Sequence, residues 1–179
     1  IWKSELPLSN WMHPILTQKN VCYSLGEIYI PSNIGFIYCL DKKNGIPQFS
    51  IPFTTPIASK PFFINDGSNE MVFVAGFNGE VCGVNLTKQQ KMWCLQTGGP
   101  KTHYSLASFD FDHKHGLLIY PSIDNGIFLI KPLTGEIVKH WLPEKDQMKW
   151  KTNFAAITKD ENELYLIDTT GQIRKFKFE

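Results

Sequence analysis

Short apolar runs alternate with polar turns along the whole chain, and these runs have the length of strands rather than helices. β-Branched and aromatic residues dominate them, as is typical of strands. Four runs lead into a turn that ends in glycine: Ile28–Ile30 before Gly35, Val72–Val74 before Gly79, Leu118–Tyr120 before Gly126, and Leu164–Leu166 before Gly171. The turn glycines are 44, 47 and 45 residues apart. The pattern therefore predicts four copies of one β unit.

Each copy divides into four predicted strands. The first strands are Trp11–Leu16, Ala58–Phe63, Ser105–Phe109 and Phe154–Ile157, and the third strands are Phe36–Leu40, Glu80–Val84, Ile127–Ile130 and Gln172–Phe176. Two of the turns between second and third strands contain Asn-Gly, the strongest short hairpin signal. No segment predicts a helix of useful length.

The predicted fourth strands each carry one aromatic residue. Phe49 and Trp93 lie 14 residues after their turn glycine, and Trp141 lies 15 after. A large ring at a nearly constant place in each repeat indicates a structural post in the seam between neighbouring sheets. The fourth repeat ends before such a strand.

This repeat length, with several strands per repeat, is typical of a propeller. We expect an all-β fold, a β-propeller of four four-stranded blades or a four-blade portion of a larger propeller. The chain, 1–179, is one propeller unit with repeats at about 8–53, 54–98, 99–143 and 144–179. Residues 1–7 are predicted as a fourth strand that closes the last blade or belongs to a preceding one. The start at Ile1 rather than Met favours the second alternative, and Trp2 is expected to be packed.

Charge and hydropathy narrow the classes of partner. The net charge is +1, which argues against nucleic-acid binding by an aromatic-basic patch of Trp11, Tyr104, Trp150 and Lys151. The longest apolar runs are far shorter than the ~20 residues that span a bilayer, so no membrane insertion is expected. Nothing in the sequence assigns a compartment.

Two turns resemble a known family signature. Cys39–Gly45 followed by Phe49, and Lys131–Gly135, are similar to the Ala-x-Asp-x-x-Thr-Gly and following Trp of pyrroloquinoline-quinone-like (quinoprotein-like) propeller repeats. Each copy departs from that signature: Asn44 and Phe49 in the first, Asn85 and Lys88-Gln89 in the second, Lys131 in the third. The resemblance implies a propeller and a degenerate, non-catalytic member of the family.

Quinone-dependent enzymes of that family use an adjacent pair of cysteines, a calcium ion and an aspartate base. This chain has no adjacent cysteines. We therefore predict no catalytic, cofactor-binding or metal-binding residues and no cofactor. Gly67–Met71 shows a weak similarity to the C-terminal propeller of a β-alanine-activating acyl-adenylating enzyme.

The sequence favours a non-enzymatic protein-interaction or scaffold module of a larger protein or assembly. The partner would be an unidentified protein, and the rest of a larger propeller is a second candidate. Two alternatives stay open: a regulatory propeller attached to an acyl-adenylating enzyme, and a degenerate quinone- or metal-dependent oxidoreductase. The full-length protein could carry an enzyme domain outside this segment.

Some residues offer chemistry that these expectations do not use. Asp110–His115 is the densest ligand-like cluster, but Lys114 lies inside it and the segment is predicted as an exposed turn. His13 and His103 lie on first strands, which line the central channel of a propeller. We expect them to be hydrogen-bonding groups there rather than ligands.

Cys22, Cys39, Cys82 and Cys94 form no Cys-x-x-Cys pair, so their spacing does not indicate zinc. We favour free, half-buried thiols, with one or two disulfides as the alternative if the chain is extracytoplasmic. The disulfide state is left open by the sequence. Asn85-Leu86-Thr87 has the form of a glycosylation acceptor, at a place where a repeat turn is predicted.

Overall fold

The chain folds into four antiparallel sheets that follow one another in sequence order. The computed structural model describes residues 1–6, 14–26, 35–57, 59–98, 109–122, 125–142, 152–157, 163–168 and 171–177. Within these ranges the chain forms strands and turns and no helix. Accordingly, no helix in the described ranges could cross a membrane.

Each sheet consists of strands that are consecutive in the sequence. Sheet 1 contains β1 (Ile15–Leu16), β2 (Asn20–Gly26), β3 (Gly35–Asp41) and β4 (Pro47–Phe53). Sheet 2 contains β5 (Phe62–Asn65), β6 (Glu70–Ala75), β7 (Glu80–Asn85) and β8 (Gln90–Gln96). Sheet 3 contains β9 (Asp110–Asp112), β10 (Leu117–Ser122), β11 (Gly126–Ile130) and β12 (Ile137–Trp141). Sheet 4 contains β13 (Thr152–Ile157), β14 (Glu163–Asp168) and β15 (Ile173–Lys177).

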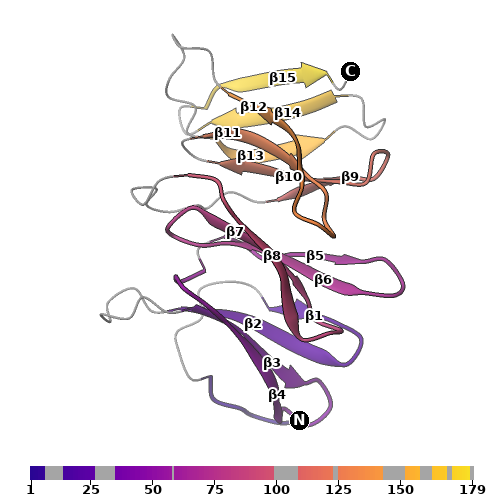
Figure 1. Ribbon diagram of the computed structural model, residues 1–179. Helices are drawn as coiled ribbons and strands as arrows, with labels where there is room; N and C mark the ends of the chain where they lie inside the picture. Colours follow the sequence, from indigo (N-terminus) through magenta and orange to yellow (C-terminus); the bar gives the residue numbers. More distant parts are fainter. Residues whose placement is uncertain are drawn as a thin grey trace.

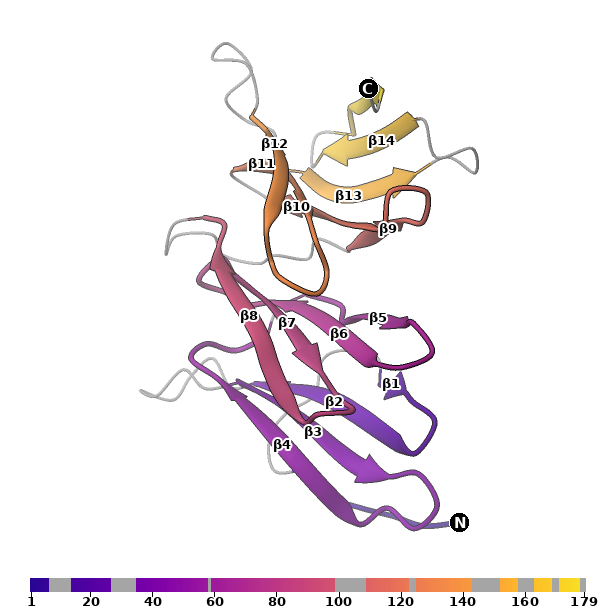
Figure 2. The ribbon, with the colours of Figure 1, turned by 45° about the vertical axis from the view of Figure 1, so that its right-hand side comes forward.

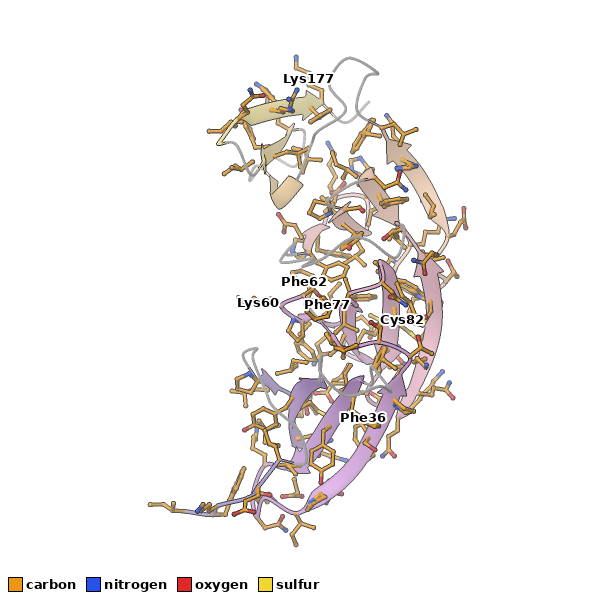
Figure 3. All side chains as sticks on the ribbon, turned by 90° about the vertical axis from the view of Figure 1, so that its left-hand side faces the viewer. Phe36, Lys60, Phe62, Phe77, Cys82 and Lys177 are labelled. Carbon is orange, nitrogen blue, oxygen red and sulfur yellow. A yellow bond between two sulfur atoms is a disulfide. The ribbon has the colours of Figure 1, made fainter. Side chains whose placement is uncertain are left out.

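The sheets stack face against face along an arc. Figure 1 shows sheet 1 and the N-terminus at one end of the stack, and sheet 4 and the C-terminus at the other. Figure 2 shows the same order after a turn of 45° about the vertical axis. The side view in Figure 3 shows the arc open on one side.

The hydrophobic core is divided among the three seams between neighbouring sheets. In β6, Val72 and Val74 pack against sheet 1, while Met71, Phe73 and Ala75 pack against sheet 3. This follows from the alternation of side chains along a strand, which sends successive residues to opposite faces. An inner sheet is therefore apolar on both faces, and β6 reads as a continuous run of buried residues.

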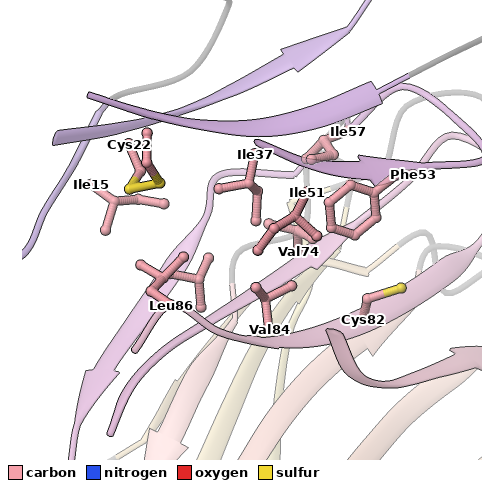
Figure 4. Close-up of a cluster of buried hydrophobic side chains, with 12 residues drawn as sticks. Ile15, Cys22, Ile37, Ile51, Phe53, Ile57, Val74, Cys82, Val84 and Leu86 are labelled. Atoms are coloured by element: carbon pink, nitrogen blue, oxygen red, sulfur yellow. A yellow bond between two sulfur atoms is a disulfide. The ribbon is translucent and has the colours of Figure 1, made fainter. Parts of the chain in front are cut away.

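The first and third seams follow the same rule. Ile37, Ile51 and Phe53 of sheet 1 join the β6 valines in the first seam (Figure 4). Leu164 and Leu166 of sheet 4 pack against residues of β10 and β11 in the third seam. Burial of apolar surface stabilises the fold by roughly 25 cal/mol per Å². Because each sheet contacts only its neighbours, the stability of the stack is a sum over the seams.

The aromatic residues of the fourth strands lie in the seams, as predicted. Phe49 packs against the first core cluster, Trp93 against the second and Trp141 against the third. The Trp141 ring also lies 5.8 Å from the Phe176 ring in sheet 4. These positions confirm their interpretation as structural posts.

Two sequence-based strand assignments are wrong in position. The second strand of sheet 1 is β2, eight residues before the predicted Ile28–Ile30, which lie outside the described residues. β2 pairs with β3 from Asn20↔Asp41 to Gly26↔Gly35. The Gly-turn spacing pointed to the wrong apolar run because the connection from β2 to β3 is longer than in the other sheets.

The first strands of sheets 2 and 3 start later than predicted, whereas β13 starts at Thr152, two residues before the predicted Phe154. β5 begins at Phe62 rather than Ala58, because Pro61 has no N–H to donate and Ser59 makes a different contact. The Ser59 hydroxyl accepts the Ala75 N–H at 2.7 Å, and the Ser59 N–H donates to the Ala75 carbonyl at 3.1 Å. β9 covers Asp110–Asp112, so this part of the predicted turn is a strand, and Ser105–Ser108 lie outside the described residues.

The four cysteines form two disulfides, so their interpretation as free thiols is wrong. Cys22 bonds to Cys39 and Cys82 to Cys94, with S–S distances of 2.04 and 2.08 Å. Each pair consists of residues directly opposite each other on neighbouring strands. Spacing along the sequence did not reveal the pairs because opposition depends on the register of each hairpin.

Candidate binding groove

Three turns of sheets 1 and 2 lie close together and form a groove of about 250 Å³. They are the β1–β2, β5–β6 and β7–β8 turns. We call this feature the turn groove. Its lining consists of Gln18, Lys19, Asn20, Asn65, Gly67, Ser68, Asn69, Glu70, Leu86, Thr87 and Gln89.

Side chains that accept backbone N–H groups shape all three turns. In the first, the Thr17 hydroxyl accepts the Asn20 N–H at 2.9 Å. In the second, Asp66 Oδ1 accepts the Ser68 and Asn69 N–H groups at 2.9 and 2.7 Å. These are Ser/Thr and Asx turn motifs, which form because Thr and Asp side chains can accept hydrogen bonds from nearby backbone N–H groups.

The third turn is built on Asn85. Its Oδ1 accepts the Lys88 N–H at 2.8 Å, and the next residue, Gln89, takes a left-handed conformation with φ 56°. Only 3% of Asn85 is exposed, and its Nδ2 donates to Asn69 Oδ1 at 2.9 Å. The amide of the Asn85-Leu86-Thr87 tripeptide is therefore a buried link between two turns, not an accessible attachment point for a glycan.

Glu70 ties the turns of the two sheets together. Its Oε1 accepts the Gln18 N–H of sheet 1 at 2.8 Å, and its own N–H donates to the Thr87 hydroxyl at 3.0 Å. The Leu86 N–H donates to the Glu70 carbonyl at 2.8 Å. The Gln18–Glu70 hydrogen bond therefore joins the two sheets, and the other two hold the β5–β6 and β7–β8 turns of sheet 2 together.

The groove presents polar groups over a small apolar floor. Leu86 is buried at its base, whereas Gln18, Ser68 and Gln89 are exposed at its rim. Asp66 lies in the β5–β6 turn but is not a lining residue; hydrogen bonds from the Asn69 and Ser68 N–H groups lower the pKa of its carboxyl. Amide and hydroxyl groups of this kind donate and accept hydrogen bonds, and a carboxylate accepts them.

The predicted ligand-like cluster is divided between a strand and a turn. Asp112 is fully buried, and its Oδ1 accepts the Lys114 and His115 N–H groups at 3.0 and 3.1 Å. The His115 ring Nδ1 donates to Asp112 Oδ2. The His113 ring packs edge-on against Phe111, with 5.0 Å between ring centroids. Asp112 therefore closes the β9–β10 turn, the same role that Asp66 has in sheet 2.

Several other residues considered in the sequence lie outside the described residues: Trp11, His13, His103, Tyr104, Trp150 and Lys151. Within the described ranges, one group brings three potential metal ligands together, with Glu80, Cys82 and Cys94 atoms within 4.8 Å of one another. The two sulfur atoms are bonded to each other, so they are not thiolate ligands in this structure.

Sequence reasoning predicted a repeat turn at Asn85–Thr87 but did not predict the groove. The signal available was that Gln18, Asn69 and Thr87 all lie in polar turns of neighbouring repeats. That these turns come from the same end of two adjacent sheets follows only from the stacking of the sheets.

No protein-family model matches the chain, and no curated protein is similar to it in sequence. Solved structures are similar in fold. The computationally designed Ika4 protein aligns with a TM-score of 0.71 and 11% identity, over 99% of this chain and 97% of that one. The Dos1 propeller aligns with a TM-score of 0.65 and 14% identity, over 89% of this chain and 38% of that one. Hsv2 of Kluyvelomyces marxianus aligns with a TM-score of 0.62 and 13% identity, over 98% of this chain and 52% of that one.

These neighbours are β-propellers, and the stacked antiparallel sheets described above have the same arrangement. The chain therefore has the β-propeller fold that the repeats predicted. The chain spans about half the length of Hsv2, less than half of the Dos1 propeller, and nearly the whole of the designed protein. These similarities show the fold and do not show membership in the pyrroloquinoline-quinone-like repeat family.

Proposed function

We propose that the chain is a non-enzymatic protein-interaction module, a scaffold propeller that serves a larger protein or assembly. The turn groove is the observation that carries this proposal. Its exposed amide and hydroxyl groups, together with Glu70 and Lys19, lie over the buried Leu86. Such a surface suits a peptide segment, because every non-proline peptide unit presents one donor and one acceptor.

The rigidity of the groove supports the same function. The bonds from Gln18 to Glu70 and from Asn85 to Asn69 hold the groups before a partner arrives. A preformed site loses less conformational entropy on binding than a mobile one. Protein recognition by loops on a rigid scaffold is a common use of such positions.

The membership in the pyrroloquinoline-quinone-like repeats is part of this proposal. It is supported by Trp93 and Gly135, two positions of the family signature that meet in the second seam. The departures at Asn85, Gln89 and Lys131 agree with a degenerate member.

A photo-crosslinking residue at Gln18 tests the groove. In an extract of cells that make the protein, we expect it to capture a partner that the same residue at Ser50, on the exposed side of β4, does not capture. The identified partner is then purified and titrated. We expect Ser68→Trp, which fills the groove, to weaken binding at least about tenfold, and the matched Ser50→Trp to leave it unchanged. Equal capture at both positions, or unchanged affinity of Ser68→Trp, would refute the proposal.

The non-enzymatic part of the proposal has its own test. Pyrroloquinoline quinone and calcium are added to the purified chain, and its melting temperature is measured. We expect no change, because a ligand that binds the native state raises the melting temperature as its concentration rises. A concentration-dependent rise would favour the oxidoreductase alternative.

A further inference from the structure

Glu80, Cys82 and Cys94 place one potential ligand atom each within 4.8 Å of one another. The two cysteines are cross-strand partners on β7 and β8, and Glu80 lies two residues before Cys82 on β7. Side chains two residues apart on a strand share a face, so all three lie on the same face of sheet 2. We call this group the Cys–Glu cluster. Its ligands are brought together by the register of two strands and not by a Cys-x-x-Cys pair, so their spacing in the sequence does not indicate a metal site.

The Cys–Glu cluster lies at the margin of the first seam. Cys82 belongs to the same core cluster as Phe53, the last residue of β4 (Figure 4). Cys82 is 1% exposed, whereas Glu80 is half-buried and Cys94 is exposed. The cluster is therefore anchored in the core on one side and accessible to solvent on the other.

Three hydrogen bonds hold Glu80 in place. Its Oε2 accepts the hydroxyl of Thr54, the residue that follows β4, at 3.1 Å. Its N–H donates to Asn78 Oδ1 at 2.9 Å, and its carbonyl accepts the Gly76 N–H at 2.8 Å. Hydrogen bonds to a carboxylate orient it as a metal ligand. Glu80 is therefore positioned beside the two sulfur atoms before any metal binds.

The charge of the Cys–Glu cluster depends on its redox state. With the disulfide intact, Glu80 supplies its one ionisable group, because a disulfide does not titrate. Reduction adds two thiols, and their ionised forms would place three negative charges in a small space. Such charges repel one another, and a bound divalent cation removes the repulsion.

The ligand types select zinc among the divalent cations. Thiolates are soft ligands that favour zinc over calcium or magnesium, and zinc also accepts carboxylate oxygen. In a tetrahedral zinc site, sulfur and oxygen ligands lie about 3.5–3.8 Å apart. Since the three atoms already lie within 4.8 Å of one another, rotation of the side chains is sufficient to reach this geometry.

The other disulfide lacks these properties. Cys22 and Cys39 are both completely buried. Within the described ranges, no carboxylate or imidazole joins this pair in a group of three ligands. Of the two disulfides, Cys82–Cys94 therefore combines solvent access with a third ligand.

We propose that reduction of the Cys82–Cys94 bond creates a zinc site in which both thiolates and the Glu80 carboxylate bind the metal. The reductant is a dithiol. Its two sulfur atoms form a disulfide as the Cys82–Cys94 bond breaks, two electrons pass to the cysteines, and the two protons of the dithiol pass to them as well. Zinc binding then releases these protons, because the metal binds thiolates. A water molecule completes the four-coordinate ion.

The chain then exists in two covalent states, a disulfide form and a zinc form. Zinc in the reduced state would link β7 and β8 at the place where the disulfide links them in the oxidised state. The site does not involve the turn groove, so this inference is independent of the proposed function.

Zinc binding by the oxidised and the reduced chain is the first test. The chain is reduced with a limited amount of a phosphine, which is then removed under nitrogen. Alkylation and mass spectrometry of a sample check that Cys82 and Cys94 are reduced and that Cys22 and Cys39 remain bonded. Titration against a chromophoric chelator should find one zinc ion per reduced chain and none per oxidised chain. Equal binding by the two forms, or binding by neither, would overturn the proposal.

The role of Glu80 is tested in the reduced chain. Glu80→Gln keeps the size of the side chain and an acceptor for Thr54 but removes the charge. It should weaken zinc binding at least about tenfold. The matched control is Glu136→Gln, at an exposed position of the turn between β11 and β12, which should leave the affinity unchanged. A Glu80→Gln chain with the affinity of the wild type would rule out the three-ligand site.

Cobalt(II) in place of zinc reports directly on the sulfur ligands. The reduced wild-type chain should show the near-ultraviolet absorption of thiolate-to-cobalt charge transfer and the visible bands of tetrahedral cobalt. Cys94→Ser should lose most of this absorption, although its Cys22–Cys39 bond remains in place. Undiminished absorption in Cys94→Ser would contradict binding of the metal by this pair of cysteines.

Discussion

The Trp93 ring lies directly over Gly135 in the seam between sheets 2 and 3. A Cβ at Gly135 would be 2.7 Å from the ring, and the indole Nε1 donates to the neighbouring Pro132 carbonyl at 2.8 Å. The tryptophan of one repeat therefore depends on the glycine of the next. This contact explains why both residue types are present at these positions of the repeat.

Gly135→Ala should destabilise the protein through two effects. A left-handed residue with a Cβ costs about 1–2 kcal/mol, and φ at Gly135 is +75°. Displacing the Trp93 ring should add about 1–3 kcal/mol, as overpacking does elsewhere. Urea unfolding monitored by tryptophan fluorescence measures the sum.

Gly116→Ala is the matched control for this prediction. Gly116 has φ +67°, and nothing lies within 4 Å of an added Cβ, so only the backbone effect should remain. Equal losses of stability for the two variants would show that the contact between Trp93 and Gly135 has no energetic role.

Leu164→Ala should destabilise sheet 4 more than the rest of the stack. Leu164 is fully buried in the third seam, and removing such a side chain costs about 2–5 kcal/mol. Because each sheet contacts only its neighbours, hydrogen exchange should become faster in β14 and β15 and stay unchanged in β6 and β7. Ile167→Ala, on the exposed face of the same strand, should change neither. Faster exchange throughout the chain would indicate a single cooperative unit instead.

The two disulfides should differ in their rates of reduction. Cys94 is exposed, whereas Cys22 and Cys39 are both completely buried. A thiolate must reach a sulfur atom to attack it, so access controls the rate. During limited reduction with dithiothreitol, alkylation and mass spectrometry should find Cys82 and Cys94 modified first. Earlier modification of Cys22 and Cys39 would contradict the burial that separates the two bonds.

The contribution of Asp66 to stability should depend on pH. Its folded-state pKa is below the usual aspartate value of 3.8, so its ionised form stabilises the fold above that pH and the contribution is lost as pH falls through the folded pKa. Asp66→Asn keeps an acceptor but loses the charge. The difference in unfolding free energy between wild type and this variant should therefore be larger at pH 7 than at pH 3. A difference that does not vary with pH would contradict this origin.

Much of the fold could be predicted from local patterns. The third strands and the turn that ends at Gly79 are where the sequence placed them, because alternation and turn chemistry act over a few residues. The second strand of sheet 1 was misplaced because two apolar runs, Val21–Leu25 and Ile28–Ile30, compete for one position. Local pattern alone does not decide which of them pairs with β3.

The amino-acid sequence by itself determined the repeat, the strand-like runs and the place of one aromatic residue in each outer strand. Only the tertiary structure decided that Cys22 bonds to Cys39, that Glu70 of sheet 2 accepts a hydrogen bond from Gln18 of sheet 1, and that Trp2 lies over Gly45. The physical reason is the range of the forces involved. Side-chain alternation and turn preferences are properties of neighbouring residues, whereas register and sheet stacking depend on the fit between surfaces far apart in the chain.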